Sequence, residues 1–295
     1  MGMPTQERIL SPSGLPTVLH PRTHMAPVRL AVLAVLVLAT SAAWALTINQ
    51  ALTMEMPMGL VVPNGAMDDM GEMAPISMAT VGWSVEGATT FLVIWAVMMA
   101  AMMLPAAAPM VLVFAAVHAK RRGQPIFVPT WIFVVGYLLV WTAVGLAVYV
   151  LVQIGRDFTA SLTSASPSTG APIALGATLA LAGLYQLTPL KRVCLTHCRS
   201  PLGFVLGHWR EGRVGALQMG IRHGGYCLGC CWALFAVLVV AGIMSLAWML
   251  LLTLVIFAEK VFPHGRRVTM GVGVVLLVLG VLVATNATRM PWITA

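Results

Sequence analysis

Long uncharged apolar runs are the feature that most constrains the fold of this 295-residue chain. A helix needs about 20 mostly apolar residues to cross a bilayer, where its backbone polar groups must be satisfied internally. The chain is 59% hydrophobic and 9% charged, whereas soluble domains carry about 25% charged residues. We therefore predict an all-α fold, a polytopic membrane helix bundle. The expected spans lie within residues 30–54, 87–119, 123–155, 158–190, 222–259 and 268–288.

The run 222–259 is too long for one helix, and its interpretation decides the number of spans. A turn near Gly242 and Ser245 would divide it into a hairpin and give about seven transmembrane helices. With a cytoplasmic N-terminus, this topology places 15 of the 17 Lys and Arg residues on the inner side, leaving Arg156 and Arg289 outside. Because cytoplasmic loops are enriched in Lys and Arg, the charge distribution favours seven spans over six.

The chain divides into a short tail and one domain. Residues 1–28 contain five prolines and predict a flexible cytoplasmic tail, whereas residues 29–295 predict a single membrane domain in contact with the lipid bilayer. That domain includes a Met-rich outer loop (49–87) and a Cys/His-rich inner segment (191–231). The composition excludes a soluble globule, a disordered chain and a nucleic-acid-binding protein, and no Walker lysine motif indicates a nucleotide site. We expect a multi-pass membrane protein.

Methionine is concentrated in two places. Seven of the 20 methionines lie in the outer loop, beside acidic residues, where there is no core for them to fill. Four more form two overlapping M-x-x-x-M pairs in the span 87–119, just before the expected kinks at Pro105 and Pro109. Residues four apart share a helix face, and thioethers are soft ligands that select Cu(I). The pairs, Met98 with Met102 and Met99 with Met103, fit a soft-metal pathway and a packed bundle equally well.

All five cysteines lie between residues 194 and 231, which the predicted topology places at the cytoplasmic membrane edge. Thiolate and imidazole together suit Cu(I), with zinc or an iron–sulfur centre as weaker alternatives. The reducing cytoplasm argues against structural disulfides. A buried cysteine can act as a small hydrophobe, but that explanation accounts poorly for histidines beside clustered cysteines. On helices, two sets of predicted metal ligands would each share a face: Cys194, His197 and Cys198, then His223, Cys227, Cys230 and Cys231.

Two further features of this region have competing interpretations. The sequence from Cys227 to Cys230 is a C-x-x-C motif, so thiol–disulfide exchange competes with metal binding. Glu259 and Lys260 lie near the inner end of the sixth expected span. We favour a snorkelling ion pair there over a charged ligand or a proton-linked group.

These motifs resemble a bacterial family of predicted metal-binding integral membrane proteins, a domain of unknown function. The resemblance covers about residues 87–280, and its H-G-x-Y-C-x-G-C-C-W run is the specific part. It implies metal binding, a location in the bacterial inner (cytoplasmic) membrane and no particular reaction. The matching residues are Trp95, Met98, Met99, Ala101, Met102, Met103, Pro105, Pro109, Met110, Cys194, Leu195, Cys198, Arg199, Pro201, Gly215, Ala216, Met219, Gly220, His223, Gly224, Tyr226, Cys227, Leu228, Gly229, Cys230, Cys231, Trp232, Glu259 and Lys260.

The sequence therefore favours a protein that handles a soft metal, most of all Cu(I). The outer loop would collect the ion, the methionine pairs would pass it inward, and the cysteines would bind it more tightly. Uptake and delivery to a membrane cuproenzyme or metallochaperone both fit this arrangement. The alternatives are a membrane thiol–disulfide oxidoreductase, with Cys194 or Cys198 as resolving partner, and a non-catalytic subunit or assembly factor of a larger complex. Whether the protein is an enzyme, and whether it is an oligomer, stays open.

Overall fold

The structure is a computed structural model that describes residues 25–53, 83–122, 127–161, 170–241 and 245–285. These residues form helices and no β-strand, which confirms the all-α prediction. Most of the predicted Met-rich outer loop (residues 54–82) and most of the predicted tail lie outside the described residues. The helices are α1 (Met25–Thr53), α2 (Val85–Arg122), α3 (Phe127–Ser161), α4 (Gly170–Leu187), α5 (Pro189–Arg199), α6 (Pro201–Gly207), α7 (Gly212–Ala241), α8 (Leu246–Val261) and α9 (Gly265–Thr285).

Five of the described helices are long and apolar enough to cross a membrane: α1, α2, α3, α7 and α9. A sixth span is obtained if α4 and α5, which are bent by 65° at their junction, count as one broken span. Helix α8 has 16 residues and is about 24 Å long at 1.5 Å per residue, shorter than a bilayer core of about 30 Å. The described helices thus supply five or six spans by length and composition, fewer than the seven that we predicted.

The helical structure is interrupted between α7 and α8, where the sequence predicted the turn of a hairpin. Helix α7 ends at Ala241, and Ser245 caps α8 by accepting a hydrogen bond from the Trp248 backbone N–H. A second break separates α4 from α5, two residues before the end of the run 158–190 that predicts one span. There Thr188 caps α5 and accepts from the Lys191 N–H, and Pro189 occupies the first turn, where a missing N–H costs little.

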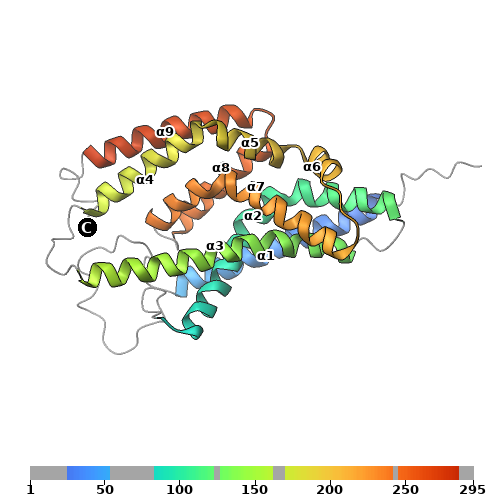
Figure 1. Ribbon diagram of the computed structural model, residues 1–295, viewed down its shortest axis with the longest axis horizontal. Helices are drawn as coiled ribbons and strands as arrows, with labels where there is room; N and C mark the ends of the chain where they lie inside the picture. The colour runs from blue at the N-terminus through green and yellow to red at the C-terminus, as the bar shows by residue number, and fades with distance from the viewer. Residues whose placement is uncertain (1–24, 54–82, 123–126, 162–169, 242–244, 286–295) are drawn as a thin grey trace, which may run out of the picture.

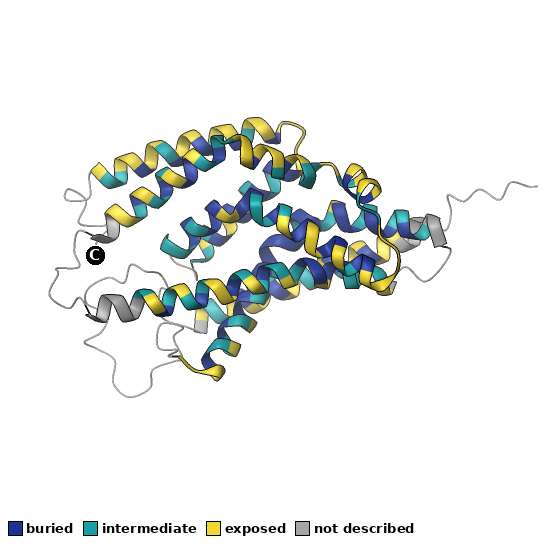
Figure 2. Cartoon of the chain, viewed as in Figure 1, coloured by how far each residue is buried: buried dark blue, intermediate teal, exposed yellow. Residues whose placement is uncertain are grey.

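The helices pack in two groups that are joined by α5, by α8 and by a direct contact between α4 and α7 (Figure 1). Helices α4 and α9 lie side by side along most of their length, and α3 packs against α7 while α1 packs against α2. The outer faces of these helices are exposed and the faces toward the centre are buried (Figure 2). Only 22% of the apolar windows of α1 and α9 is buried, as expected of helices that face lipid.

Small residues set the distance between α3 and α7. A Cβ on Gly224 would lie 2.9 Å from Val140 Cγ2 and 3.1 Å from the Tyr137 carbonyl oxygen, and a Cβ on Gly220 would collide with the Phe133 carbonyl. The absence of side chains at these positions lets the two backbones approach closely. This contact fixes α7, the helix that holds three of the five cysteines.

Candidate metal centre

Helix α7 places four of the predicted ligands on one buried face. His223 is 2% exposed, and Cys227, Cys230 and Cys231 are each at most 1% exposed. The three cysteines lie midway along this 30-residue helix, not at its end. Helix α7 begins at Gly212 and continues beyond the cysteines in both directions, and their place at the cytoplasmic edge of the membrane stays a prediction.

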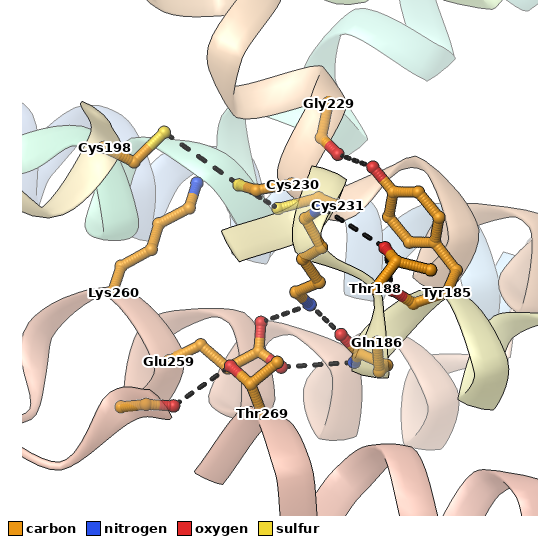
Figure 3. A network of polar contacts seen from close by, with 12 residues as sticks. Tyr185, Gln186, Thr188, Cys198, Gly229, Cys230, Cys231, Glu259, Lys260 and Thr269 are labelled. Atoms are coloured by element: carbon orange, nitrogen blue, oxygen red, sulfur yellow. Dashed lines mark hydrogen bonds and ion pairs between the residues drawn. The ribbon is translucent and has the colours of Figure 1, made fainter. Parts of the chain in front are cut away.

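Helix α5 brings a fourth sulfur to this face. The Sγ of Cys198 lies 3.9 Å from the Sγ of Cys230, which in turn lies 3.3 Å from the Sγ of Cys231. Figure 3 shows these three thiols as a connected group between the two helices. Two sulfurs 3.9 Å apart can share one ion, since a metal–thiolate bond of about 2.3 Å spans up to twice that distance. The two predicted cysteine clusters thus meet across the α5–α7 contact.

The fifth thiol, Cys194, packs on the same side of α7. Its Sγ lies 2.7 Å from where a Cβ on Gly229 would be, so the glycine makes room for the sulfur of α5. Tyr185 donates a hydrogen bond to the Gly229 carbonyl, which ties α4 to the same turn of α7. All five cysteines are free thiols in the structure.

The two predicted histidine ligands both stack against aromatic rings. His197 stacks on Tyr226 with ring centroids 4.2 Å apart, and its Nδ1 lies 2.9 Å from the Val193 carbonyl oxygen. His223 stacks against Phe133 and Tyr137, at 6.0 and 5.5 Å between ring centroids. Among the described residues, no group of three or more His, Cys, Asp or Glu side chains is placed to hold a metal ion. Shared coordination would therefore require side chains to rotate.

Two residues that the sequence analysis did not associate with the cysteines contact Cys227. Lys260 Nζ donates to the Cys227 Sγ at 2.9 Å, and the Tyr137 hydroxyl lies 3.0 Å from the same sulfur. Lys260 extends from α8 toward the cysteine group in Figure 3. Tyr137 lies in the apolar run of α3, where a polar aromatic residue carries no specific signal. A lysine at the end of an apolar run did stand out, but its partner lies 33 positions away in the sequence.

The expected snorkelling pair of Glu259 and Lys260 is wrong. Glu259 is 1% exposed and Lys260 8% exposed, and the two side chains have different partners. Glu259 Oε2 forms a buried ion pair with Lys191 Nζ at 2.7 Å, and its Oε1 accepts from Gln186 Nε2 at 3.1 Å. Gln186 Oε1 also accepts from Lys191. This closed network joins α4, α5 and α8 directly beside the thiols (Figure 3).

The four paired methionines of α2 are buried within the same hydrophobic cluster as the three cysteines of α7. Each is at most 2% exposed, and Figure 1 shows α2 bending along its length, as its two internal prolines predict. Both the metal-pathway interpretation and the packing interpretation require buried methionines, so their burial does not distinguish the two. The seven methionines of the outer loop lie outside the described residues.

The family comparison concerns this part of the chain. Residues 92–283 match the PpoB2 family, described as a copper chaperone. The chain belongs to this copper chaperone family. The matched range contains all five cysteines, the methionine pairs and Lys260, and its description names copper where the sequence resemblance implied only metal binding. No curated protein and no solved structure matches the chain.

Proposed function

We propose that this chain is an integral membrane copper chaperone that binds Cu(I) at the cysteines of α5 and α7 and delivers it to a membrane cuproenzyme. The observation that supports this most directly is the convergence of thiols from two helices, Cys198 with Cys230 and Cys230 with Cys231. Membership of a copper chaperone family indicates that the metal is copper. Thiolate sulfur favours Cu(I) over the harder ions, and Cu(I) is stable with fewer ligands than the four that structural zinc requires.

The proposed ligands comprise a core of thiols that binds the ion and surrounding residues that the ion would contact on its way to the core. Cys198, Cys230 and Cys231 form the core, Cys227 and Cys194 adjoin it, and His197 and His223 would join only after side-chain rotation. The methionines of α2 would carry the ion toward the thiols, since thioethers bind Cu(I) more weakly and release it more readily. The proposed relay consists of Met98, Met99, Met102 and Met103.

Copper binding by the purified full-length chain tests this proposal. We expect the wild type to bind Cu(I) in competition with a chromophoric Cu(I) chelator, and X-ray absorption to show sulfur ligands. Cys230→Ser should weaken binding by at least about tenfold, which corresponds to 1.4 kcal/mol. Ala233→Ser is the matched control, because it adds a buried hydroxyl to α7 without removing a sulfur. Equal Cu(I) affinity in both variants would contradict the proposal.

A comparison of two buried methionine variants tests the proposed methionine relay. Met102→Leu should slow the transfer of Cu(I) to the cysteines, whereas Met249→Leu should not. Met249 is equally buried in the same cluster but lies on α8, outside the proposed path. Equal transfer rates in the two variants would show that the α2 methionines only pack the core.

A second candidate function, thiol–disulfide exchange, is favoured by the distance between Cys198 and Cys230. The 3.9 Å separation of Cys198 and Cys230 suits a thiol pair that reduces a substrate disulfide while forming its own disulfide. This function needs no methionines and no metal. Alkylation of reduced and oxidised protein would detect it as a loss of two accessible thiols, and copper removal would leave that change intact.

For the membrane arrangement, we propose seven spans with the N-terminus in the cytoplasm of a bacterial inner membrane. The two additional spans would be the bent α4–α5 pair and the short α8. Residues 29–295 would then form one membrane domain, preceded by a cytoplasmic tail. The charge argument for this orientation depends on the exposed basic residues, because Lys191 and Lys260 are buried and paired and do not act as free loop charges.

A further inference from the structure

Cys227 differs from the other four cysteines in the groups that face its sulfur. Lys260 Nζ lies 2.9 Å and the Tyr137 hydroxyl 3.0 Å from its Sγ. An ammonium group has only donors, so the lysine must donate to the sulfur. Such donors stabilise a thiolate, the form of cysteine that binds metal. The Cys227 sulfur also interacts with the side chains of Cys230 and Cys231.

The charge of Lys260 has no carboxylate partner among the described residues that face it. Its neighbour in the sequence, Glu259, is already paired with Lys191 at 2.7 Å and bonded to Gln186 at 3.1 Å. Lys260 is only 8% exposed, and a buried charge is costly unless it is compensated nearby. The negative charge that can compensate the Lys260 ammonium is therefore carried by sulfur, and the nearest thiolate would be that of Cys227, which accepts the lysine's hydrogen bond.

The balance of charge then depends on which metal the thiolates hold. Two thiolates and one Cu(I) ion form a complex with a single negative charge, which one ammonium neutralises. The same two thiolates and a divalent ion form a neutral complex, which leaves the buried ammonium uncompensated. In a low-dielectric interior this difference is large compared with the same difference in water.

We propose that Lys260 is the specificity-determining residue that makes the cysteine site select a monovalent soft cation over divalent ones. This inference rests on the proposed function, and it takes Cys227, which adjoins the proposed thiol core, and one cysteine of that core as the two thiolates that hold Cu(I). Lys260 acts through its charge and its hydrogen bond to Cys227 and is not itself a ligand. Outer groups of this kind commonly tune the affinity of a metal site.

The ratio of Zn(II) to Cu(I) dissociation constants tests the inference. Both constants would be measured by chelator competition on the purified full-length chain in lipid nanodiscs. In Lys260→Met, which removes the charge at similar length, we expect this ratio to fall at least tenfold relative to wild type. Lys260→Arg keeps the charge and should keep the ratio. Lys260→Gln is a second neutral variant for the case in which the methionine variant does not fold.

Each outcome separates this inference from the proposed function. A ratio that is unchanged in a neutral variant, or that falls equally in Lys260→Arg, would overturn the role of the charge while leaving Cu(I) binding in place. Wild-type protein that binds no Cu(I) at its cysteines would overturn the proposed function and the inference together. A ratio that falls only in the neutral variants supports both.

Discussion

At the residue scale, the buried ion pair beside the thiols is the main contact that stabilises the site. Lys191 and Glu259 side chains are each 1% exposed and 2.7 Å apart, and Gln186 bonds to both. Each polar atom of the carboxylate thus has a partner, which is the condition under which a buried pair is tolerated. The pair fixes the start of α5 on α8, so it positions the helix that holds Cys194 and Cys198.

Removing one partner of this pair should be more damaging than removing both. Lys191→Met leaves the Glu259 charge buried without its partner, and we expect the free energy of unfolding to fall by about 3–5 kcal/mol. The double variant Lys191→Met/Glu259→Leu leaves no buried charge and should recover much of that loss. Thermal unfolding in detergent, followed by circular dichroism, measures both. Additive losses in the double variant would show that the two side chains do not stabilise each other.

At the element scale, α5 is held at both of its ends on the C-terminal end of α8. Lys191 binds Glu259 at the start of α5, and Arg199 at its end donates to the carbonyl oxygens of Glu259, Phe262 and Pro263 at 2.9, 2.7 and 2.9 Å. A cation near the last carbonyls of a helix also opposes the negative end of its dipole. This attachment sets the separation between Cys198 on α5 and Cys230 on α7.

Loosening the end of α5 should therefore increase the distance between these two thiols. In a background that keeps Cys198 and Cys230 and replaces the other three cysteines with serine, diamide should form a disulfide readily. Arg199→Gln should slow its formation several-fold, as measured by mass spectrometry of alkylated protein. Arg192→Gln is the matched control, because Arg192 is an exposed arginine on the same helix that donates to the nearby Leu187 carbonyl at 3.2 Å. Equal rates in the two variants would contradict the anchoring role of Arg199.

The helices themselves were predictable from the sequence to a useful degree. Apolar runs gave the all-α fold, and the i, i+4 spacing placed Cys227 and Cys231 on one face because both features depend on local geometry. The break at Thr188 and Pro189 lies two residues before the end of the predicted span 158–190, and a capping threonine followed by proline is a recognisable helix start. The sequence analysis did not predict that the chain continues there as a second helix, bent by 65° from the first. Hydropathy alone does not report a change of helix direction.

At the scale of the whole molecule, what the sequence could not predict are the contacts between helices. Lys191 meets Glu259 across 68 positions, and Lys260 meets Cys227 across 33. Periodicity says which residues share a face of one helix, but not which face of another helix that face will meet. The same limit explains why both charged residues near position 260 were predicted to reach outward. Their burial follows from partners on α5 and α7 that only the packed bundle supplies.

Topology is the whole-molecule property that most affects the direction of copper movement. With a cytoplasmic N-terminus, seven spans put the C-terminus outside the cytoplasm, whereas six spans put it inside. An alkaline phosphatase fusion at the C-terminus should be active and a fluorescent-protein fusion at the same site dark. A second pair of fusions at His264, between α8 and α9, should give the opposite result, since seven spans place that turn in the cytoplasm. A fluorescent C-terminal fusion would instead establish an even number of spans, and α8 would then not cross the bilayer.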